Sequence, residues 1–242
     1  MLTLKSISKS YNKGAIKAVD NLDLVVNSGE IFGFLGPNGA GKTTTIKMIV
    51  GLLKPDEGSI ILDGVNVWED SLQAKSMISY VPDNPEIYDR LNGMEYLNFI
   101  ADMYGISGEE RKSKIDYYSK LFNIEDALGD IISSFSHGMK QKLVLTSALL
   151  NNPDLFILDE PMVGLDPKSS FNLKEIMRKL CDEGKTVFFS THVMEVAEKL
   201  CDRIAIINKG KIIAHGTMGE LRQHAKERSS LENIFLELTE DV

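Results

Sequence analysis

The sequence contains few cysteines and no long hydrophobic run. Cys181 and Cys201 are the two cysteines among 242 residues, and their spacing fits neither a disulfide framework nor a metal site. No apolar run approaches the roughly 20 residues that a membrane-spanning helix needs, and residues 1–6 lack the basic and apolar parts of a signal peptide. We therefore expect reduced, packed cysteines in a cytoplasmic protein that reaches a membrane only through a partner.

Positive charge is also scarce. Lys and Arg total 27 against 35 Asp and Glu, which gives a formal net charge of −8. Sequence-independent binding of DNA or RNA depends on basic side chains that neutralise phosphates, so we expect no nucleic acid as a main partner. A bound nucleotide would instead need local backbone N–H groups, a lysine and a metal ion.

Apolar periodicity predicts an α/β protein with a helical insertion. Partial alternation over 2–7 and 18–26 predicts antiparallel strands, and the apolar run 30–35 predicts a strand covered on both faces. Further strands are predicted at 59–62, 78–81, 155–158, 186–190 and 203–208, with helices at 42–53 and from Asp166-Pro167 to Gly184. The pattern is mostly helical over 92–150, and residues 84–135 are interpreted as a helical insertion. Capping boxes are predicted for Asn92 with Glu95 and for Ser229 with Glu232.

A glycine-rich segment lies between the predicted strand 30–35 and the helix that follows. From Gly36 to Thr43 it matches the Walker A pattern G-x-x-x-x-G-K-[ST], in which backbone N–H groups and a helix N-terminus surround phosphate oxygens. Lys42 would reach the β- and γ-phosphates, and the Thr43 hydroxyl would bind Mg²⁺. The candidate nucleotide ligands here are Gly36, Pro37, Asn38, Gly39, Ala40, Gly41, Lys42, Thr43 and Thr44. The motif alone does not separate transporters from kinases, GTPases or recombinases.

Two acids end the apolar strand predicted at 155–158, which is a Walker B pattern. Asp159 would support Mg²⁺ at the edge of the sheet where ligands of open α/β sheets bind. Glu160 would polarise the attacking water, a role that typically contributes ~10²–10⁴-fold in rate. A GTPase would carry N-K-x-D for guanine, but residues 208–211 have a lysine in place of that carboxylate, so a turn at Gly210 is the preferred interpretation.

Three further motifs and one aromatic residue resemble those of a known family. Phe135-Ser136-His137-Gly138-Met139-Lys140-Gln141 is similar to the signature motif L-S-G-G-Q, although Ser136 alone could be a helix cap. Gly164-Leu165-Asp166 resembles the D-loop, and Asp166 before Pro167 is also a good N-cap. His192 resembles the switch histidine, and Tyr11 resembles the aromatic on which adenine stacks. Over nearly its whole length the chain resembles the nucleotide-binding subunits of ABC transporters.

The chain departs from the family pattern at three positions. Asp83 stands where the Q-loop has glutamine, and its carboxylate is shorter and charged but can also ligate Mg²⁺. His137 replaces the first glycine of the signature and Met139 replaces its glutamine, whereas Ser136 and Gly138 are kept. This signature resembles that of bacterial exporter-type members.

The resemblance implies a P-loop NTPase core with a mixed sheet, an N-terminal antiparallel β subdomain and a helical insertion subdomain. It implies one domain over 1–242: the core over 1–83 and 152–216, the helical subdomain over about 84–151, and C-terminal helices over 217–242. It also implies an ATPase that uses ATP and Mg²⁺. The implied catalytic residues are Glu160, His192, Lys42 and Asp166, and the implied metal ligands are Thr43, Asp159 and Asp83.

The same resemblance implies two partners besides ATP. A second ATPase subunit, identical or different, would pack head to tail so that ATP lies between one Walker A loop and the other signature helix. A membrane permease would dock near residues 84–91, which places the protein peripherally on the inner face of the cell membrane. Ile87, Tyr88 and Leu91 could contact that permease or pack in the core.

Two alternatives remain at this point. A non-transport ABC ATPase of translation or DNA repair would usually carry two cassettes in one chain or long coiled coils, and neither is visible here. A small-molecule nucleotide kinase would leave the signature, the D-loop and His192 without a purpose.

Overall fold

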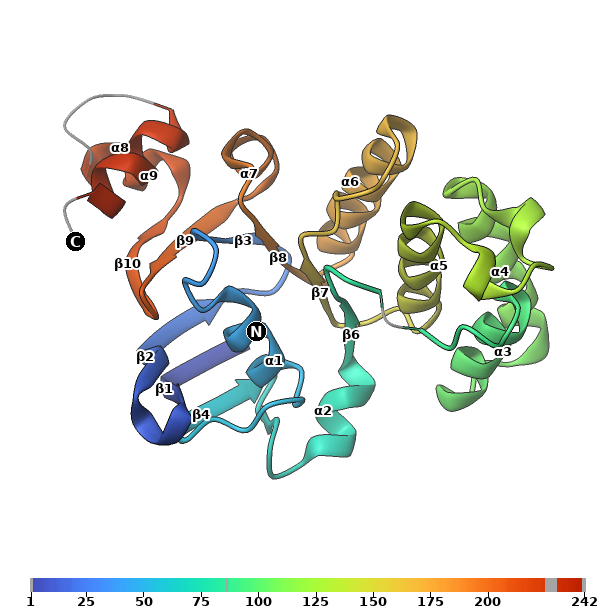
Figure 1. Cartoon of the computed structure of the whole chain (residues 1–242), viewed down its shortest axis with the longest axis horizontal. Coiled ribbons are helices and arrows are strands. Elements are labelled where there is room, and N and C mark those ends of the chain that lie inside the picture. The colour runs from blue at the N-terminus through green and yellow to red at the C-terminus, as the bar shows by residue number, and fades with distance from the viewer. Residues whose placement is uncertain (1, 86, 225–229, 241–242) are drawn as a thin grey trace.

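The computed structural model describes residues 2–85, 87–224 and 230–240. It places them in two β-sheets, a group of helices between the sixth and seventh strands, and a pair of C-terminal helices (Figure 1). Within these residues no helix combines the length and the apolar character that crossing a bilayer requires.

The first sheet is antiparallel and lies near the N-terminus. Its order is β2-β1-β4-β5, formed by β1 (Leu2–Tyr11), β2 (Ile16–Val26), β4 (Glu57–Leu62) and β5 (Val65–Asn66). Leu2 is paired with Val26 on one side and with Leu62 on the other. All three side chains are buried, because inward-facing residues of neighbouring strands share one face of a sheet.

The second sheet is mixed and carries the sequence motifs. Its order is β10-β9-β3-β8-β7-β6, formed by β10 (Lys211–Gly216), β9 (Arg203–Asn208), β3 (Ile31–Leu35), β8 (Thr186–Thr191), β7 (Leu155–Asp159) and β6 (Ile78–Val81). β10 is antiparallel to β9, and the other neighbours are parallel. The parallel strands therefore end at one common edge, to which β3, β7 and β8 bring the residues that follow them.

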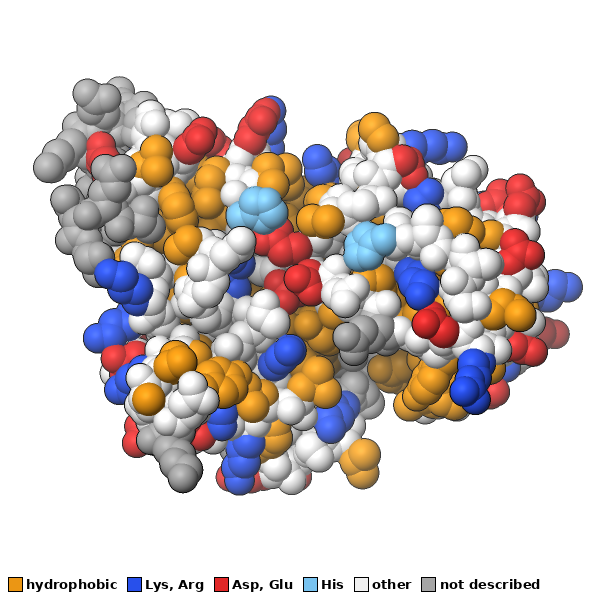
Figure 2. Space-filling view, viewed as in Figure 1, with side chains coloured by type: hydrophobic (Ala, Val, Ile, Leu, Met, Phe, Trp, Pro, Cys, Tyr) orange, Lys and Arg blue, Asp and Glu red, His pale blue; other side chains and the backbone are white. Residues whose placement is uncertain are grey.

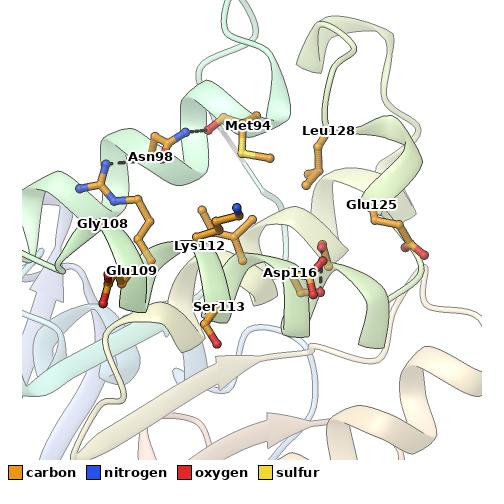
Figure 3. Close-up of a pocket in the computed structure, with 12 residues that line it drawn as sticks. Met94, Asn98, Gly108, Glu109, Lys112, Ser113, Asp116, Glu125 and Leu128 are labelled. Carbon is orange, nitrogen blue, oxygen red and sulfur yellow. Dashed lines mark hydrogen bonds between the residues drawn. The ribbon is translucent and has the colours of Figure 1, made fainter.

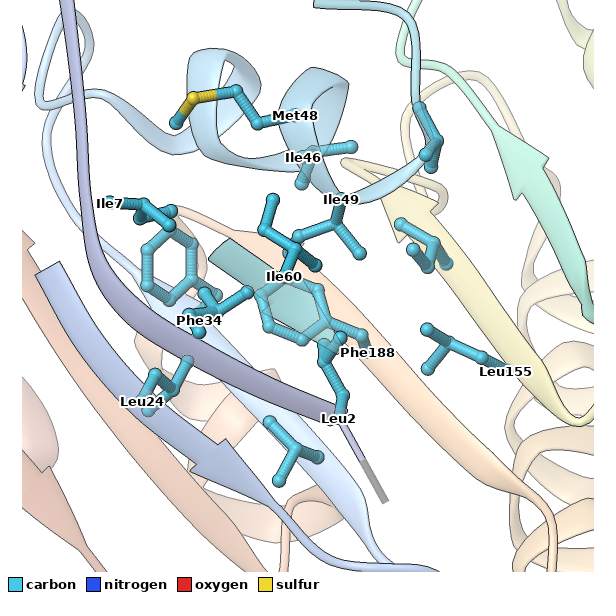
Figure 4. Close-up of a cluster of buried hydrophobic side chains, with 14 of the residues drawn as sticks. Leu2, Ile7, Leu24, Phe34, Ile46, Met48, Ile49, Ile60, Leu155 and Phe188 are labelled. Atoms are coloured by element: carbon cyan, nitrogen blue, oxygen red, sulfur yellow. The ribbon is translucent and has the colours of Figure 1, made fainter. Parts of the chain in front are cut away.

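The main hydrophobic core lies between the two sheets. Helix α1 (Lys42–Ile49) buries Ile46, Met48 and Ile49 there, and these side chains lie over Phe34 and Phe188 in Figure 4. A second cluster on the opposite face of the mixed sheet joins Phe156 and Phe189 to α5 (His137–Leu150) and α6 (Pro167–Asp182). With both faces covered, β3 and β7 are buried along their whole length, which explains their unbroken apolar sequences.

The helices after β6 form a lobe with its own core. They are α3 (Gly93–Met103), α4 (Gly108–Leu121) and α5 (His137–Leu150), with 3₁₀ turns at Glu125–Ala127 and Ile132–Ser134. Leu97, Ile115 and Leu143 are buried together in this core. The segment that enters the lobe pairs with the segment before α5: Ile132 N donates to Leu91 O at 2.9 Å and Ser133 N donates to Asp89 O at 3.1 Å.

The remaining helices flank the sheets. α2 (Ser71–Met77) precedes β6, α6 (Pro167–Asp182) follows β7, α7 (Met194–Leu200) follows β8, and α8 (Met218–His224) and α9 (Leu231–Glu240) follow β10. A short 3₁₀ turn, Asn12–Gly14, joins β1 to β2. Glu198 of α7 holds the C-terminal pair in place, because it accepts hydrogen bonds from Arg222 at 2.6 Å and from Leu231 N at 3.3 Å.

The two sheets, one antiparallel and one mixed, confirm the predicted α/β fold class. β6 and β9 have the predicted bounds, and the capping box of Asn92 with Glu95 is present at α3. The predicted helix 42–53 is wrong at its end: α1 ends at Ile49, because Gly51 has φ +71° and Leu52 N folds back to Lys47 O. Ser229 of the second predicted capping box lies outside the described residues.

Candidate functional site

The phosphate loop runs from the end of β3 to the start of α1. Gly41 has φ +108°, and a Cβ atom there would lie 2.4 Å from Ala18 O, so both the backbone angle and the space require glycine. Thr45 N and Thr45 Oγ1 donate to Gly41 O at 2.9 Å each, which starts the helix immediately after the loop. The free N–H groups of the first turn of α1 are therefore directed at the loop.

Lys42 lies over this loop with most of its side chain buried. Its Nζ atom donates to Gly36 O at 2.7 Å and to Pro37 O at 3.3 Å. Burial lowers the pKa of Lys42 from its ordinary value, while the nearby carboxylates of Glu160 and Asp159 raise it. The ammonium group is thus held close to two acids and to the loop that would surround a phosphate.

Asp159 ends β7 and joins the Walker A loop to β8. Its Oδ2 atom accepts a hydrogen bond from Thr43 Oγ1 at 3.0 Å, and its Oδ1 atom accepts one from Ser190 Oγ. Burial raises the pKa of Asp159, and the two hydroxyl donors act in the opposite direction because they stabilise the carboxylate. The two predicted metal ligands on different motifs, Thr43 and Asp159, are therefore in direct contact.

Glu160 is held in an unusual backbone conformation beside His192. Its φ of +49° lies in the left-handed region, which non-glycine residues occupy at an energetic cost and often at functional sites. Glu160 N donates to Ser190 O and Ser190 Oγ, both at 3.2 Å, which fixes the turn after β7. The Oε1 atom of Glu160 is 2.9 Å from His192 Nδ1, so the predicted general base and the predicted switch histidine are brought together.

A small cavity of about 190 Å³ collects most of the predicted nucleotide and metal residues. It is lined by Ala18, Pro37, Asn38, Gly39, Gly41, Lys42, Thr43, Thr44, Asp83, Asp159 and Glu160. Gly36 and Ala40 are buried residues of the loop itself, and Tyr11 lies at the end of β1 with 41% of its surface exposed. Acidic side chains gather over the carboxyl edge of the mixed sheet in Figure 2.

The signature residues lie elsewhere on the subunit. Ser136 caps α5, since its Oγ atom accepts a hydrogen bond from Met139 N at 3.3 Å. A separate hollow of about 410 Å³ is lined by Asn84, Pro85, Ile87, Asp89, Phe135, His137 and Lys140. Asp166 is the N-cap of α6 and accepts a hydrogen bond from Ser169 N at 2.9 Å, which confirms the capping that its sequence predicts. None of these described residues lines the phosphate cavity.

Three residues of the phosphate cavity and its surroundings were missed by sequence reasoning. Ser190 contacts both Asp159 and Glu160, and a hydroxyl at the end of the strand beside Walker B was the available signal. Ala18 lines the cavity from β2, and no sequence signal marks it. Tyr80 of β6 is close to Asp159 and Asp83, and burial together with these two carboxylates raises its pKa.

The donor set fits a magnesium ion that is shared with a nucleotide. Within residues 2–85, 87–224 and 230–240, no three His, Cys, Asp or Glu side chains form a metal site by themselves. Mg²⁺ commonly takes one or two carboxylates and completes its shell with substrate phosphates and waters. Asp159, the Thr43 hydroxyl and Asp83, all on the same cavity, match that requirement.

A larger hollow of about 850 Å³ lies between α3 and α4 (Figure 3). Met94, Asn98, Lys112, Asp116 and Leu128 are among its lining residues, and it contains none of the predicted site residues. Most of the predicted phosphate and metal residues therefore line the smaller cavity at the carboxyl edge of the mixed sheet, and none lines this hollow.

A buried strand, a phosphate loop that begins a helix, and a second strand ending in Asp159 and Glu160 define the class of P-loop nucleoside triphosphatases. Comparison with known proteins narrows that class. The family model for ABC transporters matches residues 19–163. The ABC-type transporter ATP-binding protein EcsA of Bacillus subtilis (strain 168) is 37% identical over 242 residues, which cover 100% of this chain and 97% of EcsA. The linearmycin resistance ATP-binding protein LnrL of the same organism is 40% identical over 91% of this chain and 70% of its own length.

Solved structures agree with this result. One described as the ATP-binding subunit of an ABC transporter has a TM-score of 0.93 and 34% identity, covering 98% of this chain and 99% of its own. A dimeric post-hydrolysis structure of the ATP-binding cassette MJ0796, bound to ADP and Pi, has a TM-score of 0.82 and 27% identity, covering 90% and 98%. The chain belongs to the family of ABC transporter ATP-binding subunits and is an ATPase, which confirms the predicted family and activity.

Proposed function

We propose that this ATPase works as one half of a nucleotide-operated dimer that drives a separate membrane permease. The observation that supports this most directly is the separation of the two halves of the predicted nucleotide site. The Walker residues line one cavity, whereas the signature residue His137 lines another hollow and Ser136 caps α5. A second subunit packed head to tail would bring its signature helix to the Walker cavity of the first. The MJ0796 cassette, which is dimeric in its solved structure, supports a dimer for this chain as well.

The chain's own residues would bind ATP in two ways. The phosphate loop and the N-terminus of α1 offer backbone N–H groups, and Lys42 adds a positive charge next to them. Thr43 and Asp159, with Asp83 nearby, would hold Mg²⁺, which when bound neutralises charge on the phosphates. From the second subunit, the 14-residue helix α5 would direct its N-terminus and the Ser136 hydroxyl at the terminal phosphate.

Glu160 is the residue we assign to water activation. Its carboxylate borders the phosphate cavity and is held by His192 at 2.9 Å, so the acid and the histidine would orient the water and the γ-phosphate together. Asp166 would couple the two sites across the dimer. Tyr11, exposed at the end of β1, would stack on adenine.

A negative charge introduced at position 136 tests the role of Ser136. Asp and Asn both cap helices well, so S136D and S136N should each preserve α5. In an E160Q background, S136D should weaken ATP-dependent dimerisation by about 10-fold or more relative to S136N, because a carboxylate would face the terminal phosphate. Analytical ultracentrifugation in Mg·ATP measures this. Equal dimerisation of the two variants would contradict the placement of Ser136 at a partner's nucleotide.

The permease would dock on exposed apolar side chains of the helical lobe. Of the three residues named from sequence, Tyr88 is 61% exposed, whereas Ile87 and Leu91 pack against the lobe's core. The ring of Tyr88 meets the exposed ring of Phe99 edge-on, 5.7 Å between centroids, and Met103 one turn further along α3 is also exposed. Docking there would hold the protein against the cytoplasmic face of the membrane. The resistance function in the name of LnrL and the signature sequence favour an exporter.

Replacing Tyr88 should uncouple the chain from its membrane partner. Aromatic side chains often dominate the affinity of an interface. When the tagged chain is purified from solubilised membranes, Y88A should therefore reduce the amount of permease that co-purifies with it by about 10-fold or more. Y117A is the matched control, because Tyr117 is 54% exposed and also meets a neighbouring ring edge-on. Equal loss in both variants, or no loss in Y88A, would contradict docking at this surface.

A further inference from the structure

The signature helix α5 lies against the segment 161–166 of the same subunit, which directly follows Glu160. At one end, a Cβ atom on Gly138 would lie 2.4 Å from Gly164 O, so the two backbones are in close contact. Further along, Gln141 Nε2 donates to Pro161 O at 3.5 Å, and Gln141 is fully buried. α5 is thus packed along the chain that leaves the Walker B acid.

Lys142 makes the charged contact of this interface. Its Nζ atom is 2.6 Å from Asp166 Oδ2, and 13% of the Lys142 side chain is exposed. Asp166 Oδ1 also accepts from Ser169 N at 2.9 Å, and Oδ2 accepts from Ser169 Oγ at 2.7 Å. The Lys142 ammonium and the Ser169 donors hold the pKa of Asp166 below its usual range, so the carboxylate stays ionised. The contacts with Ser169 would keep α6 capped even without Lys142.

The far end of the segment is also fixed. Glu160 N donates to Ser190 O and Ser190 Oγ on β8, and Val163 N donates to Glu160 O at 3.2 Å. A movement of α5 can therefore reach Glu160 through the segment 161–166, and the Lys142–Asp166 pair is the charged contact between α5 and that segment. Charged groups that are buried in part and well bonded resist displacement more than exposed pairs do.

We propose that Lys142 is a positioning residue for hydrolysis, which ties the signature helix to the 161–166 segment and thereby sets the position of Glu160 in the same subunit. This inference rests on the proposed function, in which α5 seats on the nucleotide of the other subunit. Seating of α5 at one ATP then aligns the catalytic acid at the other ATP. The consequence is that hydrolysis in each site depends on closure at both.

A similar ion pair elsewhere in the chain supplies a matched control. Lys185 Nζ is 2.6 Å from Asp154 Oδ1, and 23% of the Lys185 side chain is exposed. That pair joins the residues just before β8 and β7, at the opposite edge of the mixed sheet from Glu160. K185M and K142M each remove one lysine charge from a similar ion pair, so a difference between them reports the contact with Asp166.

The test measures steady-state phosphate release, thermal unfolding, and the affinity for Mg·ATP in an E160Q background. K142M should lower kcat by about 10-fold or more, as displacement of a catalytic group does, with KM and Mg·ATP affinity within about 2-fold of the parent. K142R should restore most of kcat because it keeps the charge, and K185M should match the parent. K142Q serves as a second variant if K142M folds poorly.

Each other outcome overturns the inference. If K142M and K185M have the same kcat, the pair does not position Glu160. If K142M or K142Q loses Tm, ATP affinity and kcat together, Lys142 has a purely structural role. The proposed function fails separately, if the E160Q chain neither binds Mg·ATP nor forms an ATP-dependent dimer.

Discussion

The E160Q variant should bind Mg·ATP with nearly unchanged affinity and hydrolyse it slower by about 10²–10⁴-fold. The amide keeps the size of the side chain and can still bond to His192 Nδ1, which lies 2.9 Å from Glu160 Oε1. It cannot accept a proton from water, so the nucleotide should remain intact between two subunits. We expect the variant to accumulate as a dimer in Mg·ATP and to return to monomer when ATP is removed.

Phosphate release and sedimentation in the presence and absence of Mg·ATP measure this prediction. E195Q is the matched control, because Glu195 is an exposed carboxylate on α7 that pairs with Lys199 at 2.7 Å, away from the phosphate cavity. It should behave as the parent does. Full hydrolysis by E160Q would remove Glu160 from the catalytic role and leave the left-handed turn at this position without the function we assign to it.

Replacing Lys42 should have the largest effect on nucleotide binding itself. Lys42 Nζ already lies 2.7 Å from Gly36 O within the phosphate loop, and hydrogen bonds to charged groups contribute about 1.5–3 kcal/mol each. K42A should therefore weaken Mg·ATP binding by about 10- to 100-fold. Isothermal titration calorimetry of the purified chain measures the affinity directly.

K47A controls for the loss of a lysine from the same helix. Lys47 lies on α1, one turn beyond the phosphate loop, and its side chain is exposed. Its removal should leave Mg·ATP affinity unchanged, and thermal unfolding should show that both variants are folded. If K42A bound Mg·ATP as tightly as K47A does, the phosphate site would have to lie elsewhere.

The two proposed metal ligands, Thr43 and Asp159, illustrate how the fold adds to the motifs. Thr43 and Asp159 are 116 positions apart, yet their oxygens are 3.0 Å from each other, because β3 and β7 are both neighbours of β8 in the mixed sheet. Asp83 reaches the same cavity from the end of β6. Asp83 thus lines the same cavity as Thr43 and Asp159, which makes the departure from the family's glutamine compatible with the proposed site.

The sequence alone determined the class of this protein. Gly36 to Thr43 specifies a phosphate loop because the backbone at Gly41 requires glycine and because Lys42 and Thr43 have few other uses at that spacing. The bounds of β6 and β9 and the capping box of Asn92 with Glu95 were predicted correctly, whereas the end of α1 at Gly51 was not. The family resemblance followed from the order of several such motifs.

Tertiary structure decided what lies next to what. The contact of His192 with Glu160, the hydroxyl of Ser190 on Asp159, and the pairing of Lys142 with Asp166 join residues on different elements, and their sequence spacing carries no sign of them. It also showed that the signature helix stands apart from the phosphate cavity of its own subunit. Local propensity is written in neighbouring residues, whereas these contacts depend on how the sheet and helices pack, and that is set by the whole chain at once.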